Sequence, residues 1–192
     1  MDWTGIKVKT APALEPVTVS ELKTFLSLDA STYDTMLSGY ITACRQAIET
    51  YTGRTLITTS YQLMFDSFPD IIELARPPVQ SITSITYVDT DGVTQTLSSS
   101  LYRTDLISLF GRIEPAYGES WPSIRNVSNA VTVEFKCGYG DAAASVPDAL
   151  KVAIMSLAAD MFEHREANFE LNLQENRTYK FLLDSHKIAR CV

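Results

Sequence analysis

The sequence has few of the residues on which most enzyme active sites depend. Its 192 residues include two histidines and three cysteines, Cys44, Cys137 and Cys191, which lie far apart without a CxxC pair. That spacing suggests neither a zinc site nor a disulfide framework, and it predicts reduced, packed thiols of the kind found in proteins made in a cytoplasm. The chain also lacks a run of about 20 apolar residues that could span a membrane. Residues 1–4 lack the basic and apolar stretches of a signal peptide, so none is expected.

The net charge is unfavourable for tight binding to DNA. The formal net charge is −7, whereas sequence-independent DNA binding depends on Lys and Arg neutralising phosphates. This charge does not exclude a wall past which DNA slides, because weak contact is an advantage there. With 45% hydrophobic and 20% charged residues, the composition is that of an ordinary globular domain.

The order of the expected elements is helix, helix, β-rich segment, helix and tail. A capping box at Thr18 and Glu21 and an apolar stripe over 33–51 predict two helices, the second ending at Gly53. Alternation over 131–137 predicts a half-buried strand, and Asp91-Gly92 predicts a tight hairpin. The expected fold class is α+β, a helical bundle core with an inserted small antiparallel β-sheet sub-domain. The expected parts are an N-terminal arm (1–17), a helical core (18–53 and 147–167), a β-rich insertion (54–146) and a C-terminal tail (168–192).

The helix expected after Pro147 is apolar on nearly all sides. A helix of this kind is buried on more than one side, and in a chain of 192 residues the second side is expected to be a neighbouring subunit. The predicted subunit-interface residues are Val152, Met155, Ala159 and Phe162.

The tail combines basic and apolar residues. Residues 176–192 contain four basic residues against Asp184 alone, a net charge of +3, interleaved with Tyr179, Phe181 and Ile188. Such a segment is typical of one that becomes ordered on an acidic partner. The alternative is a terminal helix that folds back on its own core, and the sequence does not distinguish the two.

No catalytic, metal or cofactor site is predicted. Asp160 and His164 share a helix face, but a metal site needs further ligands, and a solvated face is favoured. Gly138-Tyr139-Gly140 lacks the remaining residues of a phosphate loop and is expected to be a turn. Glu114 and Glu134 lie in expected strands, and nothing places them together as a glycosidase pair would require. The chain is therefore not expected to be an enzyme.

Nine short stretches follow one another over about residues 16 to 167. They are 16–23 PVTVSELK, 51–58 YTGRTLIT, 74–81 LARPPVQS, 87–92 YVDTDG, 111–115 GRIEP, 117–122 YGESWP, 131–135 VTVEF, 138–141 GYGD and 163–166 EHRE. In this order, they resemble the head-tail connector (adaptor) proteins of long-tailed bacteriophages. The sequence departs from the pattern after Asn168, where relatives often have a shorter end.

The resemblance implies a structural virion protein in the neck, assembled in the host cytoplasm. Such proteins form a dodecameric ring beneath the portal and extend the DNA channel toward the tail, without specific DNA binding, and their C-terminal segments commonly dock onto the portal. Carried over to this tail, the portal-binding residues are Arg177, Lys180, Phe181, Leu182, Leu183, Lys187, Ile188 and Arg190. The stopper or tail-completion protein is a further expected partner.

Three alternatives remain open from the sequence. The chain could itself be a stopper or tail-completion protein of the same neck. It could be a phage-encoded hydrolase using dispersed acidic residues such as Glu114, Glu134 and Glu163. It could be a DNA-binding accessory module, which the charge balance disfavours.

Overall fold

The computed structural model describes residues 3–163 and 177–188, and of 177–179 it describes the backbone alone. The chain divides into two units. The β-unit comprises Met1–Pro12 and Thr58–Tyr139, and the helical unit comprises Ala13–Ile57 and Gly140–Val192. Within the described ranges, no helix is both long and apolar enough to cross a membrane.

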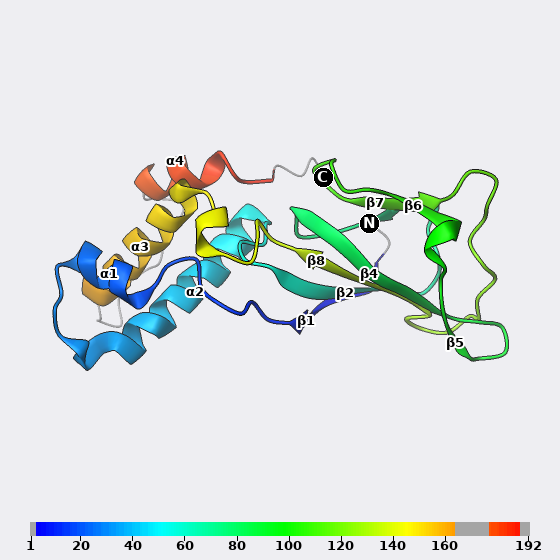
Figure 1. The fold of residues 1–192 in the computed structure, drawn as a ribbon, viewed down its shortest axis with the longest axis horizontal. Helices are drawn as coiled ribbons and strands as arrows, with labels where there is room; N and C mark the ends of the chain where they lie inside the picture. The colour runs from blue at the N-terminus through cyan, green and yellow to red at the C-terminus, as the bar shows by residue number, and fades with distance from the viewer. Residues whose placement is uncertain (1–2, 164–176, 189–192) are drawn as a thin grey trace. The chain divides into compact units, whose positions relative to one another are not determined.

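Two antiparallel sheets form the β-unit, and in Figure 1 their strands lie in two layers. The larger sheet has the strand order β1-β2-β8-β4-β5, and the smaller has the order β3-β7-β6. The strands of the larger sheet are β1 Gly5–Thr10, β2 Thr59–Phe65, β8 Val131–Cys137, β4 Val79–Val88 and β5 Thr94–Thr96. Those of the smaller sheet are β3 Ile72–Glu73, β7 Arg112–Pro115 and β6 Tyr102–Asp105, the last preceded by a 3-10 turn, η2 Ser99–Leu101.

The hydrophobic core of the β-unit lies on one face of the larger sheet. Every second residue of β2 and β8 is buried, because successive side chains of a strand point to opposite faces. The register places Tyr61 opposite Phe135 and Leu63 opposite Val133, and the rings of Tyr61 and Phe135 stack with their centroids 6.0 Å apart. The strand predicted over 131–137 is therefore confirmed.

The hairpin predicted at Asp91-Gly92 joins β4 to β5. Gly92 has a φ of 88°, which glycine adopts without the steric cost of a side chain. The Asp89 carboxylate accepts hydrogen bonds from the backbone N–H groups of Asp91 (3.0 Å) and Val93 (2.8 Å). These bonds close the turn and confirm the prediction.

Four helices are described in the helical unit: α1 Val19–Leu26, α2 Asp34–Thr52, α3 Asp148–Glu163 and α4 Arg177–Asp184, with 3-10 turns η1 Ser31–Tyr33 and η3 Ala143–Ser145. Helix α1 begins with the predicted capping box. The Thr18 hydroxyl accepts the N–H of Glu21 at 3.2 Å, and the Glu21 carboxylate accepts the N–H of Thr18 at 2.7 Å. Bonds from the backbone and hydroxyl of Thr18 hold the pKa of Glu21 below its usual value. Helix α2 ends at Gly53, as predicted, with a φ of 73°.

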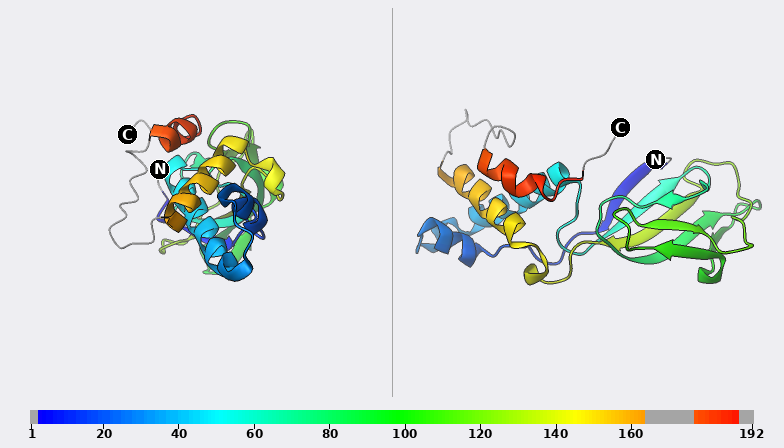
Figure 2. Two further views of the ribbon diagram at one scale, coloured as in Figure 1. Left: turned by 90° about the vertical axis from the view of Figure 1, so that its left-hand side faces the viewer. Right: turned by 90° about the horizontal axis from the view of Figure 1, so that it is seen from above.

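Helix α3 is covered by other helices of the same chain. It packs against α1, α2 and α4, and Figures 1 and 2 both show α4 alongside it. Ala153, Ile154, Leu157 and Ala158 are buried. Helices of the same chain therefore cover most of α3, and the expected contact with a neighbouring subunit stays a prediction for its exposed part.

The α+β class with antiparallel sheets is confirmed, and the structure adds detail to the expected organisation. The N-terminal arm expected over 1–17 is in part strand β1, which pairs with β2 from Gly5 to Thr10. The β-rich part contains two sheets with a hydrophobic core of their own. A helical bundle serving as the core of the whole chain is accordingly not confirmed.

Candidate functional site

The C-terminal segment, which the sequence marks as the candidate partner-binding site, contacts the rest of the helical unit. Helix α4 packs against α3 and α2, and Leu183 is fully buried in this packing. The Tyr51 hydroxyl donates to the Asp184 carboxylate at 2.8 Å, and the Lys187 ammonium lies 4.3 Å from the centroid of the Tyr51 ring. The Asp184 bond and burial raise the pKa of Tyr51.

The residues after α4 follow the C-terminal end of α2. Arg54 Nε donates to the backbone carbonyl of His186 at 2.6 Å, and the N–H of Ile188 donates to the carbonyl of Thr52 at 3.0 Å. Burial and the charge of Arg54 lower the pKa of His186. These two hydrogen bonds fix the position of residues 186–188 beside α2. The segment therefore folds back on its own unit.

The predicted portal-binding residues separate into an anchored and an outward set. Leu183 is an anchor, because its side chain is buried within the helical unit of the same chain. Ile188 is half-buried and lies near Gly53. Lys180, Phe181 and Lys187 are exposed, and Phe181 is 82% exposed; Leu182 is half-buried. The side chain of Arg177 and all of Arg190 lie outside the described residues.

The predicted subunit-interface residues of α3 are mostly covered by the chain itself. Ala159 is buried, and Met155 and Phe162 are half-buried. The Phe162 ring meets the Tyr33 ring edge-on at 5.3 Å. Val152, 40% exposed, is the member of the set that offers most surface to another molecule.

A buried ion network that the sequence reasoning missed lies on α2. Arg45 pairs with Glu15 through Nε (2.6 Å) and with Glu49 through Nη1 (2.8 Å), and the other oxygen of Glu49 accepts the N–H of Leu56 at 2.9 Å. Burial lowers the pKa of Arg45, but the two carboxylates outweigh it and leave the pKa raised. The network ties segment 13–17 and segment 55–57 to α2. The sequence did contain a signal for this network, since Arg45 and Glu49 form a charged pair four residues apart within the apolar stripe.

The acidic residues considered for hydrolysis are held in ion pairs or exposed. Glu134 pairs with Lys9 at 2.6 Å on the larger sheet, and Glu114 pairs with Arg103 at 3.0 Å on the smaller sheet. Glu163 is exposed at the end of α3. Among the described residues, no group of three His, Cys, Asp or Glu is placed to hold a metal ion, and His164 lies outside them. The geometry of the described residues does not support the hypothesis that a pair of carboxylates catalyses hydrolysis.

Comparison with known proteins assigns the chain to a family. A family model described as head completion protein matches residues 15–173. The fold is similar to that of a chain from the neck of an empty gene transfer agent (GTA) particle computed with C6 symmetry, with a TM-score of 0.83 and 22% identity over 98% of both chains. A chain of the native GTA virion matches with a TM-score of 0.80 and 24% identity over 97% of both chains. A chain from the native GTA neck, computed with C12 symmetry, gives 0.77 and 24% over 98% of both chains.

No curated protein matches the sequence. The family model covers more than half of the chain and confirms the resemblance to proteins of the phage head-tail junction. The chain belongs to the head completion protein family.

Proposed function

We propose that this chain is an adaptor subunit of a phage-like neck. Copies of it form a ring beneath the portal, extend the DNA channel and join the capsid to the tail. The family supports a structural role in the particle, and the shared fold with chains of GTA necks supports this position. The C6 and C12 symmetries with which those necks were computed fit a ring of twelve copies.

The observation that carries the proposal is the outward face of α4. Leu183 is buried against the helical unit, while Phe181 is 82% exposed, with Lys180 exposed beside it. A large aromatic side chain that a folded helix holds in water is a favourable anchor for a partner, because aromatic residues dominate the binding energy of interfaces. The lysines fit an acidic rim around the apolar site on the portal.

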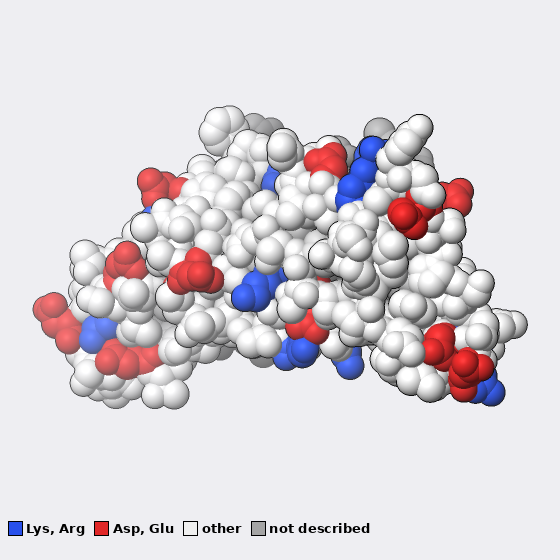
Figure 3. Space-filling view, turned by 45° about the vertical axis from the view of Figure 1, so that its right-hand side comes forward, with Lys and Arg blue, Asp and Glu red and all other residues white. Residues whose placement is uncertain are grey.

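The charge of the chain fits a channel wall that does not retain DNA. The formal net charge is −7, and Figure 3 shows basic and acidic side chains interspersed on one face, without a large area of a single sign. Tight phosphate binding needs concentrated Lys and Arg. DNA therefore passes through the ring without specific binding.

We further propose that the exposed edge of α3 at Val152 takes part in the lateral contacts of the ring, with smaller contributions from Met155 and Phe162. Ala159 contributes little, because its side chain is already covered. This is a narrower surface than the sequence pattern suggested.

The test is a pull-down with the portal protein of the same particle. Phe181→Ser should weaken portal binding at least tenfold, since loss of an aromatic hot spot costs about 2 kcal/mol or more. Phe25→Ser is the matched control, because Phe25 on α1 is also exposed and should be neutral. Deletion of 176–192 should also abolish binding, but it removes the buried Leu183 and uncovers α2 and α3, so the point substitution carries the test. Full binding by Phe181→Ser would refute the assignment of α4, and binding to a tail protein instead of the portal would identify a stopper.

A further inference from the structure

The loop between β6 and β7 presents an apolar side chain entirely to solvent. Ile107 is 99% exposed, and Leu109 in the same loop is exposed as well. The Asp105 carboxylate accepts the backbone N–H groups of Ile107 and Ser108, each at 3.0 Å. These bonds define the turn, so Ile107 protrudes from an ordered loop of the β-unit.

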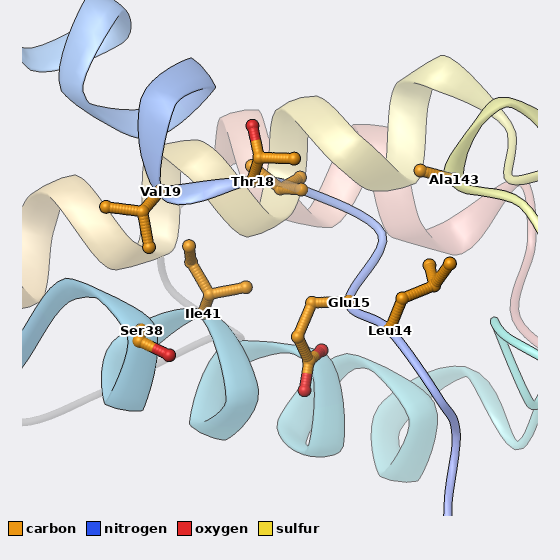
Figure 4. A pocket seen from close by; sticks show the side chains of 8 residues that line it. Leu14, Glu15, Thr18, Val19, Ser38, Ile41 and Ala143 are labelled. Carbon is orange, nitrogen blue, oxygen red and sulfur yellow. The ribbon is translucent and has the colours of Figure 1, made fainter. Parts of the chain in front are cut away.

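The helical unit contains an open apolar pocket of about 290 Å³. Its apolar lining consists of Leu14, Val17, Val19, Ile41 and Ala143. Figure 4 shows Leu14 and Ile41 pointing into the space between the segment before α1, helix α2 and η3, while the Glu15 side chain is directed toward α2. Glu15 is engaged by Arg45, so its carboxylate is already neutralised there.

The size and chemistry of this pocket suit an aliphatic side chain. An apolar cavity of about 150 Å³ accepts a benzene molecule, so 290 Å³ has room for the four-carbon side chain of an isoleucine. Filling the pocket with Ile107 would remove apolar surface from water on both partners. The loop and the pocket therefore complement each other.

We propose that Ile107 of one copy occupies the pocket of the next copy in the ring. This inference rests on the proposed ring. A closed ring of more than two subunits needs two different, mutually complementary surfaces on every subunit. The chain has such a pair, and the members lie on different units: the protruding loop on the β-unit and the pocket on the helical unit. The occupant is thus a second copy of this chain.

Disulfide trapping in portal-bound rings tests the contact. With Cys191→Ser as the background, Ile107→Cys and Ala143→Cys are combined, since a disulfide forms only where the two Cα atoms come within about 7 Å. Mild oxidation should give a ladder of covalent oligomers that a reductant reverses, and neither single variant should give it. The control pairs Ala143→Cys with Tyr117→Cys, which is equally exposed on another loop, and should give no ladder.

The remaining outcomes of the trapping experiment each count against the contact between Ile107 and the pocket. Rings that form without a ladder overturn the contact but leave the proposed ring intact. A disulfide within one chain, seen as a faster-migrating monomer, shows that the loop fills its own pocket and also overturns it. Failure of the unmodified chain to form rings on the portal refutes the proposed function, and the inference falls with it.

A substitution gives a second, independent measurement. Ile107→Ser should weaken lateral association about tenfold or more per contact, because it removes a large apolar side chain from the interface. Ile107→Val should nearly retain association, and Tyr117→Ser should be neutral. The side chain makes no core contact in the single chain, so circular dichroism should remain unchanged. Normal ring assembly by Ile107→Ser would overturn the inference.

Discussion

Replacing Arg45 with methionine should destabilise the helical unit strongly. The Arg45 side chain is 7% exposed and joins two carboxylates, those of Glu15 and Glu49. Methionine has a similar length but cannot donate a hydrogen bond, so both carboxylates would lose their cation while remaining near a buried position. Removing one partner of a buried ion pair costs about 3–5 kcal/mol, because the other charge is left uncompensated.

The two carboxylates differ in how they can respond. The Glu15 side chain is 26% exposed and can recover water, whereas that of Glu49 is 11% exposed. Glu49 also accepts the N–H of Leu56, so it cannot turn toward solvent without releasing that backbone group. Most of the expected loss of about 3–5 kcal/mol therefore comes from Glu49. Arg45→Lys should cost less, because it retains the charge, although a single ammonium lacks the fork that bridges both acids.

The measurement is urea unfolding followed by two signals. Far-UV circular dichroism reports mainly the helices, whereas both tryptophans, Trp3 and Trp121, belong to the β-unit. With an m-value of about 1–3 kcal/mol/M, Arg45→Met should lower the dichroism midpoint by roughly 1 M or more. The fluorescence transition, fitted separately, should move by no more than the dichroism transition, because the network lies within the helical unit.

The control is an ion pair of the same unit whose carboxylate can recover water when its cation is removed. Lys23 pairs with Asp34 at 3.0 Å, and the Asp34 side chain is 46% exposed. Lys23→Met should cost about 0–1 kcal/mol. If Arg45→Met costs no more than Lys23→Met, the network does not stabilise the fold and the reasoning is wrong.

Three further predictions concern local features. Thr18→Ala should lower the free energy of unfolding by about 1 kcal/mol. The pKa of Glu21 in the folded chain lies below its ordinary value of 4.5, so the stabilisation from the capping box is complete above pH 4.5 and is lost as the pH falls through the folded-state pKa. Acid titration followed by circular dichroism, in wild type and variant, checks this. Leu183→Ala should speed amide exchange over 180–188 by at least about 30-fold, since truncating a buried leucine costs about 2 kcal/mol or more. Burial raises the pKa of Cys44 to about 12 and that of Cys137 still further, so iodoacetamide at about pH 8 should modify neither thiol in the folded chain, as read by peptide mass mapping.

Features set by short-range chemistry could be predicted from the sequence. The capping box at Thr18, the glycine end of α2, the Asp91-Gly92 turn and the alternation of β8 each depend on residues a few positions apart. Their free energies are decided locally, so their patterns are visible in the chain itself. The family resemblance followed the same stretches, and the family match over 15–173 confirms it.

Features set by pairing distant segments were missed. Strand β1 pairs with β2, with Ile6 opposite Leu63, and the sequence of residues 5–10 did not indicate that partner. The position of Leu183 was undecided for a similar reason: the apolar and basic residues of the tail suit a foreign surface and the chain's own α2 and α3 equally well. The composition of a segment indicates that its apolar side chains will be buried, but it does not indicate which surface will cover them.

The difference between surface covered by the chain itself and surface left for a partner also determines how copies of the chain can assemble. The apolar surface of α3, which suggested a broad face awaiting a neighbour, is largely covered by α1, α2 and α4 of the same chain. Among the described residues, exposed apolar side chains such as Ile107, Phe181 and Val152 lie on separate elements rather than on one broad face. Isolated contacts of this kind give weak association pair by pair, and they become effective when a template holds the copies together, because every further contact is then made at a high effective concentration. A portal ring that engages one helix of each copy would supply that template, so portal docking and lateral closure of the ring would be coupled through simple mass action rather than through a change of fold.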